Sequence, residues 1–306
     1  MFEPLRIRDF IITRAGWVFA VASYDNKDTV HGFLRYVPDP TGERVMPDGT
    51  RYRKLGFDEA GALMQSSGCY ARGLCTISFE ELSEVKHPCE YIERNADAAV
   101  LQIVKVLERY GVNRRKMGVT GSRLVGLETE TSDIDFVVYG TSSFARGRQA
   151  LQQAIQSGDV QPIDRATWHR IYRKRSPELS FDEFVLHEKR KLNRAMVGTT
   201  YFDLLFVRDF DEISIGPLGT DNGYATICAK VTGAKYAFDS PAIYEVEHST
   251  VDEVLSYTHT YAGQAREDEV IEARGLCNEG DTTRLIVGTT REARGEWIKS
   301  CTLLSQ

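Results

Sequence analysis

The sequence predicts an α+β protein, in which a central mixed sheet is flanked by a β-rich N-terminal domain and a small C-terminal β-barrel. Three observations support this prediction. Residues 1–90 contain apolar stretches typical of antiparallel strands, residues 91–219 alternate between helical and strand-like patterns, and residues 220–306 return to short strand-like stretches. The chain of 306 residues has the length of two or three domains of average size.

The N-terminal region, residues 1–90, is expected to fold as a meander of antiparallel strands. Residues 8–13, 16–24 and 29–37 are rich in apolar and β-branched side chains and are separated by short turns. Proline and glycine indicate a loop over 38–49. Two short helices should follow, and Ser78 with Glu81 has the spacing of a capping box for the second.

The central region, residues 91–219, is predicted to form a mixed α/β layer because its strand-like and helical segments alternate. The expected strands are 117–121, 133–140 and 199–207. The expected helices are 93–110, 143–156, 164–175 and a last one that begins at Ser180, where Glu183 completes a capping box.

The C-terminal region, residues 220–306, contains five strand-like stretches, which are 224–233, 242–247, 253–261, 268–277 and 283–290. Five short strands joined by turns are typical of a small barrel. The region carries 8 Lys and Arg against 14 Asp and Glu. This acidity argues against RNA binding by the barrel and favours a structural or protein-contact role.

Composition excludes several classes of protein. Apolar residues make up 42% and charged residues 27%, so the chain can build a core, and a net charge of −6 gives no global signature of nucleic-acid binding. No apolar run is long enough to cross a bilayer and no signal peptide is found, so we expect a cytoplasmic protein. The six cysteines are expected to be free thiols, because the chain is long and the compartment is reducing, and the spacing of Cys69, Cys75, His87 and Cys89 matches no common zinc pattern.

The most informative stretch is MGVTGSRLVGLETETSDIDFVVYG, residues 117–140. A strand ends at Gly121-Ser122, where glycine permits a tight turn and a close approach of a ligand to the backbone. If a helix begins at Ser122, its free N–H groups form an anion site that the serine hydroxyl extends. Taken alone, the same dipeptide is also typical of an ordinary turn with a helix N-cap.

Three aspartates lie in or beside apolar strands. Asp133 and Asp135 are two residues apart and therefore share one face of a strand, and Asp203 lies within TTYFDLLFV. Buried carboxylates that lie close together repel one another, and a divalent cation relieves this cost. Asp209 and Asp211 are less suitable than Asp203, because their segment is charged rather than apolar.

This pattern resembles the nucleotidyltransferase superfamily that includes DNA polymerase β, over about residues 93–207, and the layout resembles an uncharacterised predicted-nucleotidyltransferase family. The elements that carry the resemblance are Gly121-Ser122, Asp133, Asp135 and Asp203. It implies transfer of NMP from an NTP such as ATP, with release of pyrophosphate. The three acids would bind two Mg²⁺ ions, or alternatively Mn²⁺. Gly121 and Ser122, with Arg123, would bind the phosphates.

One basic segment, residues 165–194, stands out because it holds 9 Lys and Arg against 4 acids, with Trp168, His169 and Tyr172 among them. It is interpreted either as a clamp for the triphosphate or for RNA or DNA, with stacking aromatics, or as two helices with solvated faces. His169 and His187 are expected at the surface rather than in catalysis. The alternative function, of a different class, is a nucleic-acid-binding or regulatory protein that keeps the fold without turnover.

Overall fold

The computed structural model describes residues 4–65, 70–71, 74–214, 216, 219–290 and 293–306. The chain packs into two compact units. The first comprises residues 1–162 and 193–215, and the second comprises 163–192 and 216–306. The basic segment therefore contributes its two helices to the second unit, whereas the predicted catalytic acids belong to the first. The division into domains 1–90, 91–219 and 220–306 stays a prediction.

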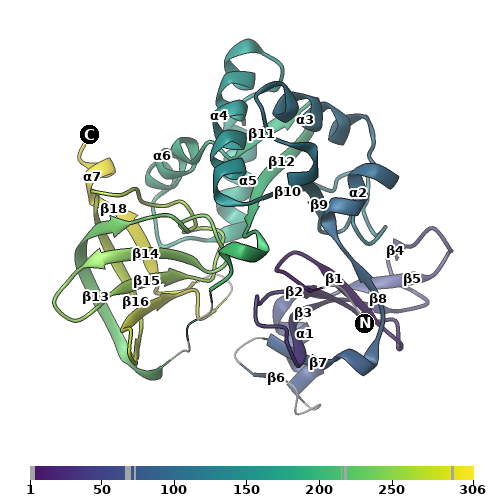
Figure 1. Cartoon of the computed structure of the whole chain (residues 1–306), viewed down its shortest axis with the longest axis horizontal. Helices are drawn as coiled ribbons and strands as arrows, with labels where there is room; N and C mark the ends of the chain where they lie inside the picture. The colour runs from purple at the N-terminus through teal and green to yellow at the C-terminus, as the bar shows by residue number, and fades with distance from the viewer. Residues whose placement is uncertain (1–3, 66–69, 72–73, 215, 217–218, 291–292) are drawn as a thin grey trace. The chain divides into compact units, whose positions relative to one another are not determined.

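The N-terminal part of the first unit is an antiparallel sheet of eight strands, as the meander pattern predicts (Figure 1). Its path is β4-β5-β3-β2-β1-β8, and β7 pairs with both β3 and β6. The strands are β1 (Phe10–Thr13), β2 (Val18–Val21), β3 (Thr29–Pro38), β4 (Arg44–Val45), β5 (Arg51–Lys54), β6 (Tyr70–Ala71), β7 (Leu74–Ser78) and β8 (Leu82–Lys86). Helix α1 (Phe57–Gln65) follows β5.

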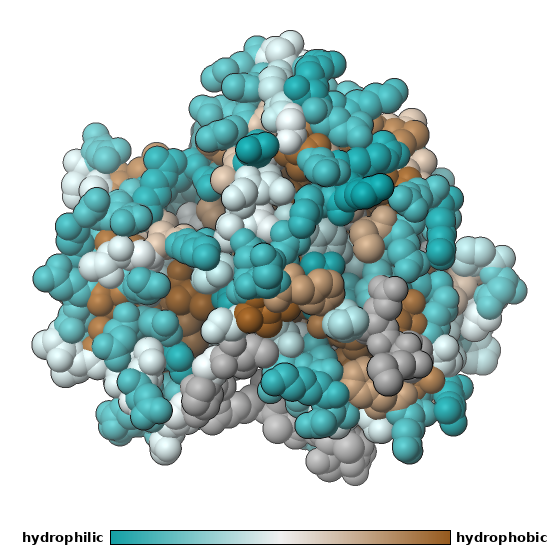
Figure 2. Space-filling model, viewed as in Figure 1, coloured by the Kyte–Doolittle hydropathy of each residue, from teal (hydrophilic) through white to brown (hydrophobic). Residues whose placement is uncertain are grey.

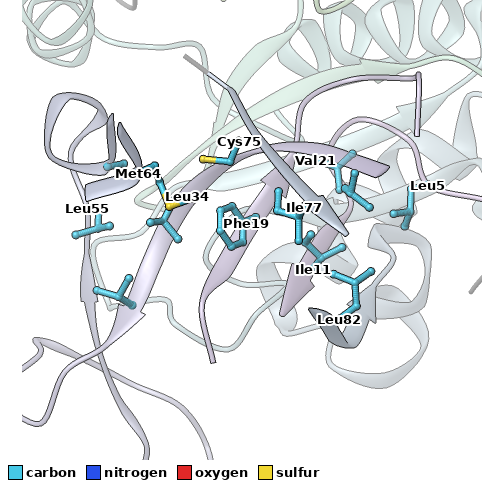
Figure 3. Close-up of a cluster of buried hydrophobic side chains, with 13 residues drawn as sticks. Leu5, Ile11, Phe19, Val21, Leu34, Leu55, Met64, Cys75, Ile77 and Leu82 are labelled. Carbon is cyan, nitrogen blue, oxygen red and sulfur yellow. The ribbon is translucent and has the colours of Figure 1, made fainter. Parts of the chain in front are cut away.

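A continuous apolar core stabilises this sheet (Figure 3). Phe19, Leu34 and Ile77 come from three of its strands and are almost completely buried. Met64 of α1 packs against the same core. The Ser78–Glu81 capping box is confirmed, although it begins a single 3-10 turn, Phe79–Glu81, rather than a helix.

The central sheet of the first unit has four strands in the order β11-β12-β10-β9. They are β9 (Met117–Thr120), β10 (Ile134–Tyr139), β11 (Arg194–Val197) and β12 (Thr200–Val207). Strands β10 and β12 are parallel, and the outer strands pair with them in antiparallel fashion. The interior of β10 is buried from Phe136 to Tyr139, which explains its unbroken apolar run.

Helices α2 (Pro88–Arg94), α3 (Ala98–Arg109) and α4 (Thr141–Ser157) accompany this sheet (Figure 1). Phe144 of α4 packs edge-on against Phe206 of β12, with ring centroids 5.4 Å apart. The helix predicted over 93–110 is confirmed over Ala98–Arg109, but its predicted start is wrong, because Asp97 caps the helix by accepting a hydrogen bond from the Val100 N–H. Two 3-10 turns complete the unit, Arg114–Lys116 and Phe210–Glu212.

The second unit contains a six-stranded sheet and the helices α5 (Arg165–Arg175), α6 (Phe181–Lys191) and α7 (Cys301–Leu304). The Ser180–Glu183 capping box is confirmed at the start of α6. The strands are β13 (Thr220–Gly233), β14 (Ala242–Glu247), β15 (Glu253–Ser256), β16 (Val270–Glu279), β17 (Arg284–Val287) and β18 (Trp297–Ser300). The five expected strands are present, and β18 is an additional one. Pairing runs β13-β14-β15-β17-β16, and β16 also pairs with β13.

Within the described ranges, the chain has no helix of the length and apolarity that a membrane span requires. The face shown in Figure 2 is largely hydrophilic, and its hydrophobic areas are small and separated.

Candidate active site

Asp135 and Asp203 lie side by side in the central sheet. They are partners in the register of the parallel strands β10 and β12, so both side chains project from the same face. Neighbouring strands are about 4.8 Å apart, which brings the two carboxylates close together. Both residues are half-buried, whereas their strand neighbours Ile134, Phe136 and Leu204 are buried.

Asp133 precedes β10 directly and is exposed, and its charge still acts on this pair. Burial first, and then the negative charges of Asp203 and Asp133, raise the pKa of Asp135 from 3.8 to about 6. The positive charges of Arg8 and Arg35 act in the opposite direction and lower this pKa. Three carboxylates thus act on one another at one end of the sheet, and their negative charges add to the effect of burial.

Asp203 also has protein partners that the sequence did not reveal. Its Oδ1 atom accepts a hydrogen bond from Tyr201 Oη at 2.8 Å and pairs with Nε of Arg194. Arg194 lies on β11 directly opposite Asp203 in register, and Tyr201 lies two residues earlier on the same face of β12. A tyrosine two residues before a carboxylate in a strand is a recognisable signal, but the arginine partner depends on the sheet pairing.

The donor set fits Mg²⁺, because carboxylate oxygens are its preferred protein ligands and the excess negative charge at Asp135 is what a divalent cation would neutralise. However, no three His, Cys, Asp or Glu side chains converge tightly enough for one ion anywhere in the described residues. The Arg194 guanidinium already occupies the Oδ1 atom of Asp203, so a cation that binds this atom would compete with it. To bind a metal ion through Oδ1, Asp203 would therefore have to give up at least part of its contact with Arg194.

Gly121 directly follows β9 beside the acid pair, and this position must be glycine for two reasons. Its φ angle of +73° lies in the left-handed region, and a Cβ atom at this position would overlap with Oδ2 of Asp135. The adjacent Thr120 is paired with Asp135 in the antiparallel register of β9 and β10. The bare backbone at Gly121 is thus what allows the turn to pass directly against the carboxylate.

No regular helix begins at Ser122, so that expectation is wrong. Residues 121–126 form consecutive turns, in which the Leu127 N–H donates to the Ser122 carbonyl at 2.9 Å. Gly126, with φ +68°, provides a second left-handed residue that prevents helix propagation. Arg123 pairs with Asp97, so an incoming phosphate would compete with that carboxylate for its guanidinium.

The N-terminal sheet supports this turn. Arg44 of β4 donates from Nη1 to the Leu127 carbonyl at 3.0 Å, and Thr120 donates from Oγ1 to the Arg8 carbonyl at 2.6 Å. Asp209, which was the alternative acid, instead pairs with Lys116 at 2.7 Å and begins a 3-10 turn. The structure therefore brings Asp203, and not Asp209, beside Asp135.

The aromatic side chains of the basic segment pack against neighbouring rings of the second unit, which favours the interpretation as packed helices with solvated basic faces. Trp168 is 5% exposed and packs edge-on against Phe184, and His169 stacks on Phe181 with centroids 3.8 Å apart. His187 is completely buried, which contradicts its expected surface position. Burial, as the main cause, lowers the pKa of His187 to about 4.

The contacts of His187 and of Cys75 are structural. His187 Nδ1 lies 2.7 Å from the Glu183 carbonyl, and its Nε2 accepts a hydrogen bond from the Ser300 N–H at 3.0 Å. Cys75 is buried in the apolar core of the N-terminal sheet. Cys69, the first member of the cysteine and histidine cluster, lies outside the described residues.

Comparisons with known proteins identify the family of the chain. A sequence model of the nucleotidyltransferase domain matches residues 100–192, which include Gly121, Asp133 and Asp135. The uncharacterized protein MJ1086 of Methanocaldococcus jannaschii is 37% identical over 335 aligned positions, which cover 96% of this chain and 98% of the relative. No solved structure matches the chain. The chain therefore belongs to the nucleotidyltransferase superfamily, in a family that it shares with MJ1086.

Proposed function

We propose that the protein transfers NMP from an NTP to an acceptor, with release of pyrophosphate, in the cytoplasm. The observation that carries this proposal is the in-register pair of Asp135 and Asp203, closed on one side by the glycine turn at Gly121. Carboxylates on adjacent strands beside a bare backbone turn can hold the metal-bound triphosphate of a nucleotide.

In this proposal Asp133, Asp135 and Asp203 hold two Mg²⁺ ions, or Mn²⁺ in their place. When bound, these ions activate the acceptor hydroxyl and stabilise the charge on the departing pyrophosphate. The backbone at Gly121 and the hydroxyl of Ser122 bind the β- and γ-phosphates, and Arg123 contributes once a phosphate replaces Asp97 as its partner.

The reaction balances as a displacement at the α-phosphorus. The acceptor oxygen forms a bond to this phosphorus, the bond to the bridging α,β-oxygen breaks, and that electron pair leaves with pyrophosphate. The acceptor proton passes to a base or to solvent. Asp135, whose pKa is raised to about 6, is ionised at neutral pH and so is suited to hold a cation throughout the displacement.

An RNA or DNA acceptor is supported by the exposed positive charges of α5. Arg165, Arg170, Arg173 and Lys174 are exposed along this helix. Arg175 differs, because it pairs with the buried Glu188 at 3.4 Å. The other four are thus the candidates for contact with nucleic-acid phosphates.

Because the pairing of β13 through β17 returns to β13, we also propose that the sheet of the second unit closes into a small barrel.

Incubation with each α-³²P-labelled NTP, Mg²⁺ and either total RNA or cell lysate tests the proposal. We expect a labelled RNA, protein or small molecule with wild type and no label with Asp203→Asn. Asp211→Asn, which alters an exposed acid outside the pair, is the matched control and should label normally. Strong RNA binding without consumption of any NTP would contradict the enzymatic proposal and favour the nucleic-acid-binding alternative.

A further inference from the structure

A strained arginine in the turn before β1 lies beside the acid pair. Arg8 has φ +76°, a left-handed conformation that is uncommon for residues other than glycine. It is the third residue of a tight turn in which the Asp9 N–H donates to the Arg6 carbonyl at 3.2 Å. This position of a turn, when φ is positive, favours glycine or asparagine. A long cationic side chain is therefore held where local energetics disfavour it.

The surrounding contacts force this conformation on Arg8. Its N–H donates to the Val21 carbonyl at 3.1 Å, and the Val21 N–H donates to the Asp9 carbonyl at 2.8 Å. The Asp9 side chain is 1% exposed, accepts from the Arg6 N–H at 2.9 Å, and pairs with His87 at 3.2 Å. Strain that is held in place from several sides is found mostly at functional sites.

The same turn is joined directly to the active-site strand. The Arg8 carbonyl accepts the 2.6 Å hydrogen bond from Thr120 Oγ1, and Thr120 is the register partner of Asp135 and the residue before Gly121. This contact fixes the start of the Arg8 side chain beside the place where the acids and the glycine turn meet. The Nε atom of Arg8 is shielded from solvent, and the residue as a whole is half-buried.

We propose that Arg8 is a phosphate-binding residue, whose guanidinium contacts the triphosphate that the carboxylate pair and the glycine turn position. This inference rests on the proposed function. The geometry supports it, because the Arg8 carbonyl is bonded to Thr120, which lies opposite Asp135 in the register of β9 and β10. Arginine suits the role, since its planar guanidinium makes two parallel hydrogen bonds to phosphate oxygens. The N-terminal sheet thereby becomes part of the nucleotide site.

The strain makes the inference testable by a substitution that should harm binding without harming the fold. Arg8→Gly removes the cation and also relieves the left-handed φ angle, so its melting temperature should equal or exceed that of wild type. Loss of charge-assisted hydrogen bonds should weaken nucleotide binding by roughly 10- to 100-fold. Arg8→Lys keeps the charge but loses the paired geometry, and it should retain part of the affinity.

Calorimetry with Mg²⁺ and each of ATP, GTP, CTP, UTP and inorganic triphosphate provides the measurement, alongside thermal unfolding without ligand. Ser176→Gly, at another left-handed position with φ +44°, is the matched control and should bind like wild type. We expect weaker binding of every triphosphate by Arg8→Gly at an undiminished melting temperature. Wild-type affinity in Arg8→Gly, or a lowered melting temperature, would overturn the inference and leave the proposed function intact. A wild-type protein that binds no NTP would overturn both.

Discussion

Removing the charge of Asp135 should stabilise the first unit while it abolishes activity. The pKa of Asp135 is raised from 3.8 to about 6 by burial and by the carboxylates of Asp203 and Asp133. Between these two pH values the folded state binds more protons than the unfolded state, so stability falls as pH rises. Above pH 6 the full penalty is present. A difference of about 2 pK units corresponds to about 3 kcal/mol.

The variant Asp135→Asn should recover most of this penalty at pH 7.5 and none of it near pH 4, where the wild-type carboxyl is already protonated. For a unit of this size, about 3 kcal/mol corresponds to a rise of about 5–10 °C in the melting temperature. Scanning calorimetry in a metal chelator at both pH values measures the effect, with the exposed-acid variant Asp211→Asn as control.

Addition of Mg²⁺ gives the matching comparison. A bound cation should raise the melting temperature of wild type and leave that of Asp135→Asn unchanged. If Asp135→Asn is no more stable than wild type at pH 7.5, or if its gain is the same at both pH values, then the carboxylates do not repel one another as inferred. The electrostatic account of the site would then be wrong.

Three further predictions follow from individual contacts. Gly121→Ala should lower activity by about 100-fold or more, whereas Gly198→Ala, with a similar φ angle of +59° but open space around it, should not; steady-state kinetics of both variants tests this. Because the pKa of His187 is lowered to about 4, the second unit should lose up to about 3 kcal/mol of stability as pH falls from 6.5 to 4, and calorimetry of His187→Gln should show no such dependence. Charge reversal of Arg170 and Arg173 should weaken RNA binding and reduce its log–log salt slope by about 0.7 per lost phosphate contact, with NTP affinity unchanged in a filter-binding assay. Unchanged RNA binding would indicate that the basic face of α5 is only a solvated surface.

Part of the site could be predicted from the sequence because a charged residue in an apolar strand has few explanations. Asp135 and Asp203 each interrupt such a run, and the strand period predicts that Asp133 and Asp135 share one face. The parallel pairing of β10 with β12 then brings them into register. Local signals of this kind also identified the capping boxes at Ser78 and Ser180.

The features that could not be predicted depend mostly on partners that are distant in the sequence. His187 is buried because it accepts a hydrogen bond from the Ser300 N–H, 113 residues away, and no local pattern reveals this contact. Arg8 reaches the site through Thr120, 112 residues away. The missing helix after Ser122 has a local cause, the left-handed Gly126, whose effect competes with the helical interpretation of the Gly-Ser motif.

Pyrophosphate release tests the central claim most directly. Wild-type protein should release one pyrophosphate for each NMP that becomes attached to acceptor, only in the presence of Mg²⁺ or Mn²⁺, and Asp135→Asn should release none. The two products can be counted together from a mixture of α-³²P- and γ-³²P-labelled NTP. Formation of inorganic phosphate in place of pyrophosphate, or equal release by wild type and Asp135→Asn, would contradict nucleotidyl transfer at this site.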